Sequence, residues 1–291
     1  MIYLKGLEDV ISYSIVHPTW NKTKPDDEKD THCGWVFRSP GDEPLSNSLG
    51  HGSFACDEHL IPDTVTNCKN VREIYERHEN TEGPFSTPLL YDKKGGTIVN
   101  NESTDILKML NSEFNEFAKN DTDLYPAELE ETLKELNDNF IYPKVNNGVY
   151  RCGFATTQYA YDEASVKLFD ALEELEVRLD KTRYLTGNKF TWLDLRLFMT
   201  LVRFDPVYIT YFKTNQKRLV DYPNLLGFVR DVYSMEPIKR SINMEHIKMH
   251  YFTSHPVHNT FGIIPIYDGP DLNVPHGREK MSADGKDGCS M

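Results

Sequence analysis

The 291-residue sequence has no apolar run long enough to cross a membrane and no excess of basic residues. A spanning helix needs about 18 or more consecutive apolar residues. The first nine residues also lack an apolar core followed by small residues, so we expect no signal peptide. The 32 basic and 45 acidic residues give a net charge of −13, and an acidic chain is repelled by nucleic acid and anionic lipid. We therefore predict no nucleic-acid partner and no membrane partner.

Cysteine is scarce as well. The five cysteines are Cys33, Cys56, Cys68, Cys152 and Cys289. An odd, widely scattered set does not resemble a disulfide framework, so we expect a reducing compartment, with the cytosol as the default. Cys289 is third from the end and therefore misses the prenylation pattern.

Aromatic residues are plentiful, with 16 Tyr, 15 Phe and 3 Trp, and they predict packed cores. The first part of the chain, about 1–112, has the pattern of an α/β domain. Its expected elements are a strand at 10–16, a helix at 70–78, short strands at 88–91 and 97–99, and a helix after 105. The polar stretch 19–69 is too long for an ordinary connection, so we expect either a functional insertion or a mobile excursion.

The second part, about 125–252, predicts long amphipathic helices. The 3.6-residue period runs through 127–142, 157–179, 191–204 and 224–235. Thr191 and Asp194 have the spacing of a capping box. Residues 253–291 return to Pro, Gly, His and Asp, and we expect a C-terminal extension whose last 15 or so residues are disordered.

Three strings carry a family resemblance. They are NNGVYRCGFATTQ at 146–158, NNES at 100–103 and MEHIKMHYF at 244–252. The chain resembles the glutathionyl-hydroquinone reductases, also called xi-class glutathione transferases, from Lys5 to about Ile266. The resemblance implies a glutathione transferase-like fold: a partial thioredoxin-like, glutathione-binding domain followed by an all-helical bundle. It also implies glutathione as co-substrate, no metal, and a homodimer.

The family reaction uses a cysteine in a Cys-Pro-Trp tripeptide at the end of the first strand. Its thiolate attacks the thioether sulfur of a glutathionyl-hydroquinone, and a helix N-terminus beside it would favour the thiolate. This sequence contains no Cys-Pro-Trp. By the resemblance, Lys5–Asp9 ends the first helix, so we expect the nucleophile and the first strand to lie before Met1 in a longer protein. The alternative is a true variant without the nucleophile, which binds glutathione or dimerises without catalysis.

Two short segments are the predicted holders of glutathione. Glu102 and Ser103 stand where a strand gives way to a helix, and a helix N-terminus favours an anion. The resemblance implies that they hold the γ-glutamyl end, whereas simple helix capping is the alternative. Thr87 precedes Pro88, which the resemblance implies is cis, so that the Thr87 backbone can pair with the cysteinyl part. The alternative for Pro88 is an edge-strand proline.

Other candidates rest on the resemblance alone. Trp35 would lie against glutathione, or else anchor the long loop. Arg72 or Arg77 would make a charged contact with the tripeptide, or else be ordinary surface residues. Tyr150 and Tyr251 would form the hydroquinone pocket, where a phenol can exchange a proton with a quinol oxygen.

Two kinds of residue could suggest other chemistry. Cys152 and Cys33 are possible replacement nucleophiles, but we expect Cys152 to be a buried, inert thiol and Cys33 to have no catalytic role. Zinc-compatible residues occur in two groups, and we expect structural roles for both. In the first group a pair at i and i+4 could share a helix face and bind zinc, but no Glu or Cys completes a known pattern, and the second group is irregularly spaced. The groups are His246, His250, His255 and His258, and His51, Cys56, His59 and Cys68.

Overall fold

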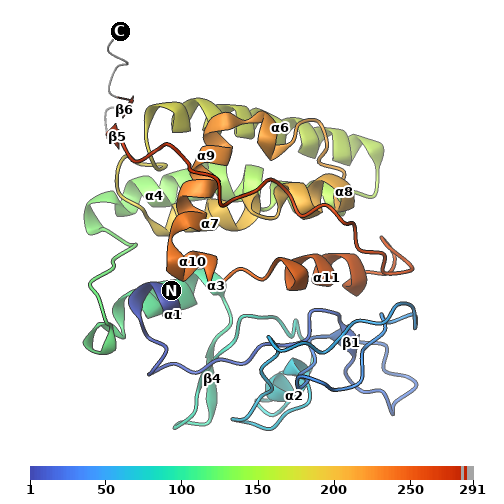
Figure 1. The fold of residues 1–291 in the computed structure, drawn as a ribbon. Coiled ribbons are helices and arrows are strands. Elements are labelled where there is room, and N and C mark those ends of the chain that lie inside the picture. The colour runs from blue at the N-terminus through green and yellow to red at the C-terminus, as the bar shows by residue number, and fades with distance from the viewer. Residues whose placement is uncertain (283–284, 287–291) are drawn as a thin grey trace. The chain divides into compact units, whose positions relative to one another are not determined.

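The computed structural model describes residues 1–282 and 285–286, which fall into two compact units (Figure 1). The first unit consists of residues 1–121 and 243–265. The second consists of residue 122 to residue 242 and of the chain from 266 onward. Within the described residues, no helix combines the length and the apolar character that crossing a bilayer demands.

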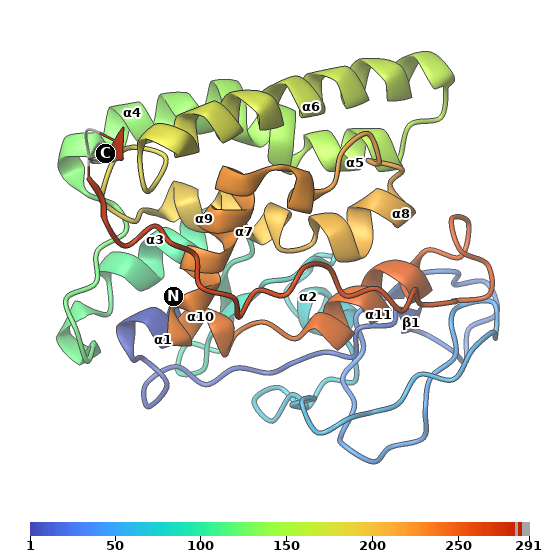
Figure 2. The ribbon, with the colours of Figure 1, turned by 45° about the horizontal axis from the view of Figure 1, so that its top comes forward.

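The second unit is a bundle of helices (Figure 2). Its elements are η2 (Ala127–Leu129), α4 (Glu130–Leu136), η3 (Asn137–Asn146), α5 (Gly148–Gly153), α6 (Gln158–Lys181), α7 (Trp192–Leu201), η4 (Phe204–Tyr208), α8 (Ile209–Tyr211), η5 (Leu219–Asp221), α9 (Pro223–Ser234), α10 (Glu236–Lys239) and the hairpin β5 (Met281–Ser282) and β6 (Gly285–Lys286). The longest helix, α6, packs against α5, η3 and α9. The predicted all-helical part is confirmed.

Local sequence explains where the long helices begin. The side chain of Thr157 accepts a hydrogen bond from the backbone of Ala160 and so caps α6. Thr191 and Asp194 form the predicted capping box at the start of α7. Leu168, Leu172, Leu175 and Leu179 recur every three or four residues along α6 and are fully buried.

The predicted helix at 127–142 has a different form. Only α4 is α-helical, and the chain then continues as η3, a π-helical stretch that contains Pro143. Proline removes one backbone donor and crowds the preceding turn, so a regular α-helix cannot continue through it. The wider π turn accommodates the proline and leads into α5.

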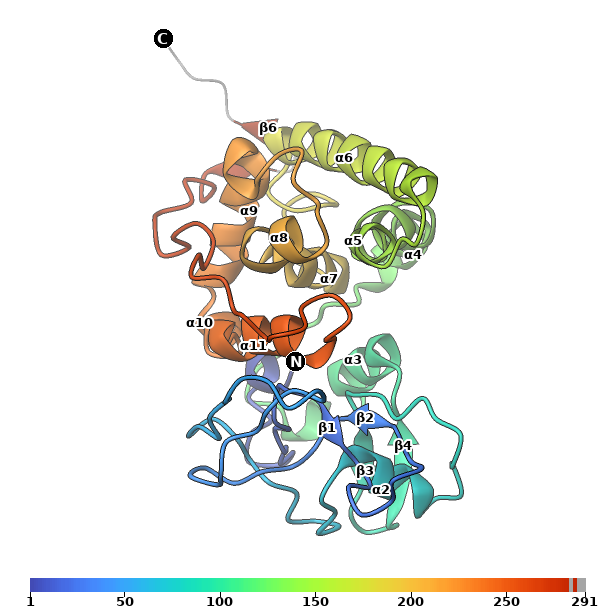
Figure 3. The same cartoon turned by 90° about the vertical axis from the view of Figure 1, so that its right-hand side faces the viewer.

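The first unit contains short elements (Figure 3). They are α1 (Ile2–Lys5), β1 (Asn21–Lys22), β2 (Cys33–Gly34), α2 (Val71–Glu76), β3 (Leu90–Asp92), β4 (Thr97–Asn100), α3 (Ser103–Ser112), η1 (Asn115–Phe117) and α11 (Met244–Ser254). The predicted helix at 70–78, the strand–turn–strand hairpin and the helix after 105 are confirmed as α2, the antiparallel pair β3–β4 and α3.

The predicted strand at 10–16 is wrong. Within the described residues, only Ile15 of this run makes a strand-like pair, an isolated antiparallel bridge with Ile61. The two backbone hydrogen bonds of that bridge are 2.8 and 3.2 Å long. A run of β-branched residues becomes a strand only when a neighbouring chain pairs with several of its residues.

The long stretch 19–69 is a packed insertion. It contains the β1–β2 pair and the bridge between Leu45 and Phe54, and Val36 bridges to Asn70 beyond its end. Val36, Leu45 and Phe54 are each 7% exposed. The mobile excursion considered from the sequence is therefore not what the structure shows.

Two C-terminal segments depart from the expected division of the chain. Residues 243–265, which include α11, belong to the first unit, although the sequence suggests a helical domain that continues to 252. Arg278 belongs to the second unit, is 4% exposed and donates to the carbonyls of Thr182 and Arg183. The predicted disorder therefore does not extend to 277–282, and residues 283–284 and 287–291 lie outside the described residues.

Candidate functional site

The Thr87–Pro88 peptide bond is cis, as the resemblance implies. Both residues are exposed and come directly before β3. Within the described part of the chain, no hydrogen bond joins the backbone of Thr87 to another residue. The N–H and C=O of Thr87 are therefore available to an extended peptide-like ligand.

Glu102 and Ser103 lie at the start of α3, and both side chains are exposed. The Glu102 carboxylate accepts a long hydrogen bond of 3.5 Å from the Thr104 backbone. The Ser103 hydroxyl lies 3.4 Å from the same carboxylate oxygen. This arrangement caps the helix weakly and presents a carboxylate and a hydroxyl to solvent, so an amine and a carboxylate of a ligand could both find partners there.

Asn101 and Tyr75 bring these two segments together. The Asn101 amide donates to the Tyr75 hydroxyl at 2.9 Å and to the Ser86 hydroxyl at 3.2 Å. The Tyr75 hydroxyl donates to the Ser86 carbonyl at 3.0 Å. Because Asn101 adjoins Glu102 and Ser86 adjoins Thr87, the predicted glutathione contacts share one hydrogen-bonded framework. The sequence analysis missed both Asn101 and Tyr75, although Asn101 stands inside the NNES string.

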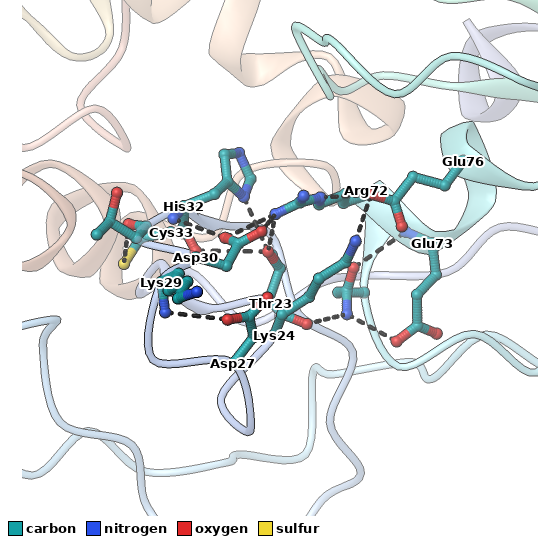
Figure 4. A network of polar contacts seen from close by, with 12 residues as sticks. Thr23, Lys24, Asp27, Lys29, Asp30, His32, Cys33, Arg72, Glu73 and Glu76 are labelled. Carbon is teal, nitrogen blue, oxygen red and sulfur yellow. Dashed lines mark hydrogen bonds and ion pairs between the residues drawn. The ribbon is translucent and has the colours of Figure 1, made fainter.

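Arg72 belongs to a network of charged side chains between the long insertion and α2 (Figure 4). Its guanidinium pairs with Asp30 at 2.7 Å and with Glu76 at 2.8 Å. Burial alone would lower the pKa of Arg72, but the hydrogen bonds and charges of Glu76 and Asp30 raise it. The guanidinium carbon also lies 5.4 Å from the centroid of the Phe85 ring. Arg72 is thus engaged within the protein and supports the segment that leads to Thr87.

Arg77, the other arginine considered, is exposed and donates to the Thr66 carbonyl at 2.6 Å. Within the described residues, no hydrogen bond or ion pair joins Arg77 to Arg72 or to the Thr87 segment. Its position favours the interpretation of an ordinary surface residue.

Trp35 is half-buried in a cluster of aromatic rings. Its indole stacks on His250 of α11, with centroids 4.5 Å apart, and meets Trp20 edge-on at 5.6 Å. The buried hydroxyls of Thr19 and Thr253, from the insertion and from α11, are hydrogen-bonded at 2.7 Å. Trp35 therefore anchors the long insertion to α11, which is the structural role considered for it.

The two candidate tyrosines lie in different units. Tyr251 is on α11 in the first unit and is 7% exposed. Tyr150 is on α5 in the second unit, is 38% exposed, and packs on Phe212 with centroids 5.3 Å apart.

None of the described cysteines is set up as a nucleophile. Cys33, Cys56, Cys68 and Cys152 are free thiols, and burial raises the pKa of each. The effect is largest at Cys152, whose pKa is raised to about 11. A raised pKa lowers the thiolate fraction, and the thiolate is the attacking species. Cys289 lies outside the described residues.

Four of the histidines and cysteines that are zinc-compatible by type contact other residues. His246 lies 2.8 Å from the Asp57 carboxylate, and the Nδ1 atom of His250 lies 3.0 Å from the Pro18 carbonyl. His51 packs on Phe261, and Cys56 lies 3.6 Å from the Glu43 carbonyl. Residues 1–282 and 285–286 contain no group of three or more His, Cys, Asp or Glu side chains arranged to hold a metal ion.

Comparison with known proteins identifies the family and the fold. Residues 158–231 match the glutathione S-transferase C-terminal domain. The chain is 43% identical over 276 residues to the glutathionyl-hydroquinone reductase YqjG of Escherichia coli, covering 95% of this chain and 76% of that protein. The glutathione-bound structure of YqjG superposes with a TM-score of 0.82 and covers 95% of this chain and 82% of that one.

A second solved structure gives the same result. The glutathione-S-transferase Xi from Phanerochaete chrysosporium is 39% identical, with a TM-score of 0.79 over 94% of this chain and 85% of that one. These identities and coverages extend across both units. The chain belongs to the xi-class glutathione transferases, the family of the glutathionyl-hydroquinone reductases.

Proposed function

We propose that the first unit binds glutathione and that the ligand class extends to glutathionyl-hydroquinones. The observation that carries this proposal is the pairing of an unengaged Thr87 backbone, before a cis proline, with Glu102 and Ser103 at the start of α3. Glutathione is an extended tripeptide that carries both an amine and a carboxylate at its γ-glutamyl end. The backbone of Thr87 suits its middle, and Glu102 and Ser103 suit that end.

The proposed chemistry is exchange at sulfur. A thiolate attacks the thioether sulfur of the conjugate, the carbon–sulfur bond breaks, and the ring carbon takes a proton to give the free hydroquinone. The same displacement joins the attacking sulfur to the glutathionyl sulfur in a mixed disulfide, and a second glutathione attacks that disulfide, which frees the thiol and releases glutathione disulfide. Overall the ring carbon is reduced, and the thioether sulfur of the conjugate and the thiol sulfur of the second glutathione are oxidised. Tyr150 and Tyr251 are the proposed hydroquinone contacts.

The described cysteines do not supply that thiolate, because burial raises the pKa of all four. We therefore propose that this chain binds glutathione and its conjugates but releases hydroquinone slowly. The same observation favours a second candidate function, a glutathione-binding homologue without catalysis.

Calorimetry with glutathione and an assay of hydroquinone release separate these possibilities. We expect measurable glutathione binding that weakens several-fold in Ser103→Ala, while Ser112→Ala, at the other end of α3, binds as the wild type does. Unchanged glutathione binding in Ser103→Ala would contradict the proposal that the start of α3 contacts glutathione. Rapid hydroquinone release by the wild-type chain would show that a group in this sequence acts as the nucleophile. The cysteine that forms the mixed disulfide could then be identified by peptide mass.

We also propose that the chain forms a homodimer through its helical unit. In support, α6 exposes large apolar side chains along its length: Tyr159 is 79%, Val166 55% and Val177 59% exposed. The spacing of Tyr159, Val166 and Val177 places them on one face of the helix, and an exposed apolar face is typical of a surface that another chain covers. Light scattering measures the mass in solution, and Val166→Lys with Val177→Lys would shift a dimer toward monomer.

A further inference from the structure

The hydroxyl of Tyr75 is buried at the junction between the two proposed glutathione-binding segments. Tyr75 is 3% exposed and lies on α2. Its hydroxyl accepts a hydrogen bond from the Asn101 amide at 2.9 Å and donates one to the Ser86 carbonyl at 3.0 Å. One hydroxyl thus joins the end of β4 to the segment before the cis proline.

The two residues that the Tyr75 hydroxyl contacts adjoin the proposed glutathione contacts. Asn101 precedes Glu102, and Ser86 precedes Thr87. Both ends of the relay are therefore one residue from a proposed ligand contact. A shift of either peptide would move the Thr87 backbone relative to the start of α3, and a rigid ligand that touches both would lose one set of contacts.

The same helix supports the segment a second time. The Tyr75 ring packs on Phe85 with centroids 5.8 Å apart, and the guanidinium carbon of Arg72 lies 5.4 Å from the centroid of the same Phe85 ring. Arg72 and Tyr75 are three residues apart and so lie on one side of α2. Two side chains of α2 thus fix Phe85 and Ser86, immediately before Thr87.

We propose that Tyr75 is a positioning residue for glutathione. Through Ser86 and Asn101 it sets the distance between the Thr87 backbone and the Glu102–Ser103 pair, although it does not touch the ligand. This inference rests on the proposed function, because it concerns the affinity of the same site.

The test is glutathione affinity in Tyr75→Phe, which keeps the ring and removes only the hydroxyl. We expect the dissociation constant to rise about five- to tenfold, because the hydrogen bonds of the hydroxyl to both Asn101 and Ser86 are lost. Tyr91→Phe is the matched control, because Tyr91 lies in β3 of the same unit and packs on His78 rather than on this relay. Binding is measured by calorimetry at a temperature where circular dichroism shows each variant to be folded.

Asn101→Ala removes the other side chain of the same relay. Because Asn101 is exposed, we expect this variant to fold even if Tyr75→Phe does not. If the relay acts as a unit, the double variant Tyr75→Phe/Asn101→Ala loses no more affinity than the weaker-binding single variant. A purely structural role would lower the melting temperature of Tyr75→Phe and leave its glutathione affinity within twofold of the wild type, and that result would overturn the proposal. Additive losses in the double variant would also overturn it. If the wild-type chain binds no glutathione, the proposed function fails first, and the inference fails with it.

Discussion

Different interactions stabilise the interiors of the two units. The second unit has an apolar interior in which Leu168, Leu193, Leu197, Phe198, Phe212, Phe228 and Val229 are completely buried. The first unit has short elements, and buried polar contacts join its distant segments, among them the Thr19–Thr253 hydroxyl pair and the Arg72 network. Apolar burial is non-directional, whereas hydrogen bonds fix geometry. In the unit that carries the proposed glutathione contacts, directional interactions therefore help to set the positions of segments that are far apart in the chain.

The largest expected effect is in the second unit, at one of its few buried carboxyl groups. Asp194 is 0% exposed and accepts hydrogen bonds from the Leu185 and Thr191 backbones at 2.8 and 2.9 Å. Asp194→Ala leaves those donors unsatisfied, so we expect the free energy of unfolding to fall by about 2–4 kcal/mol. Urea unfolding followed by far-ultraviolet circular dichroism measures it. A loss below 0.5 kcal/mol would mean that apolar packing alone determines the stability of this unit.

The pH dependence of stability sharpens the same point. Burial raises the pKa of Asp194 to about 6, above the value of about 3.9 expected in the unfolded chain. The folded state therefore holds this proton more tightly, so the stability of the wild type relative to Asp194→Asn should fall as pH rises from about 4 to about 6. Urea unfolding of both proteins across this range gives the difference. A difference that is flat with pH, or that grows as pH rises, would contradict the expectation.

Close packing in the second unit can be tested with two glycines of α5. A Cβ on Gly153 would lie 2.0 Å from Cδ1 of Phe212, which is fully buried, whereas a Cβ on Gly148 would lie 3.6 Å from the nearest Leu168 atom. We expect Gly153→Ala to cost about 1–3 kcal/mol by overpacking and Gly148→Ala to be neutral or slightly stabilising. Thermal melts compare them, and equal melting temperatures would show that Phe212 moves freely.

In the first unit the matching test concerns hydrogen bonds. Thr253→Val leaves the Thr19 hydroxyl without its 2.7 Å partner, so we expect a loss of about 1–2 kcal/mol. Thr19→Val should cost less, because the Thr253 hydroxyl still donates to the Met249 carbonyl. The double variant should cost less than the sum of the two single variants, since it leaves no hydroxyl of the pair unmatched. Strict additivity in denaturant unfolding would show that the pair contributes nothing as a pair.

The smallest effect is expected at the arginines of the first unit. The Arg72 side chain is 11% exposed but pairs with carboxylates that water partly screens, so Arg72→Gln should cost about 1 kcal/mol. Arg77→Gln, the control, should cost less than about 0.5 kcal/mol. High salt should shrink the difference between the two variants. If the difference persists at 1 M salt, the packing of Arg72 on Phe85 is the larger contribution.

Sequence patterns correctly predicted the helices and the hairpin whose hydrogen-bond partners are close in sequence. The period of buried leucines predicts α6, and the Thr191–Asp194 spacing predicts the start of α7. The hairpin β3–β4 follows from the turn residues at 93–96. The run 10–16 has strand composition and is not a strand, because its pairing depends on a distant partner that only Ile15 meets.

Some residues of the candidate site could be predicted from the sequence and others could not. The NNES string and Thr87–Pro88 could be found in the sequence through the resemblance, and the cis bond implied for Pro88 is present. Tyr75 could not, because nothing in its local pattern distinguishes a core tyrosine from one whose hydroxyl joins two loops. The pairing of Arg72 could not be predicted either, because one of its carboxylate partners, Asp30, is 42 residues away in the chain.

Periodicity, turn chemistry and long matching strings are local properties, and for that reason the helical bundle, the hairpin and the family can be predicted from the order of residues. Three features could be known only after folding: α11 belongs to the first unit, Arg72 is paired within the protein, and one buried hydroxyl links the two proposed glutathione contacts. Those outcomes depend on hydrogen bonds and ring contacts between residues far apart in the chain, and such contacts exist only once the chain has folded.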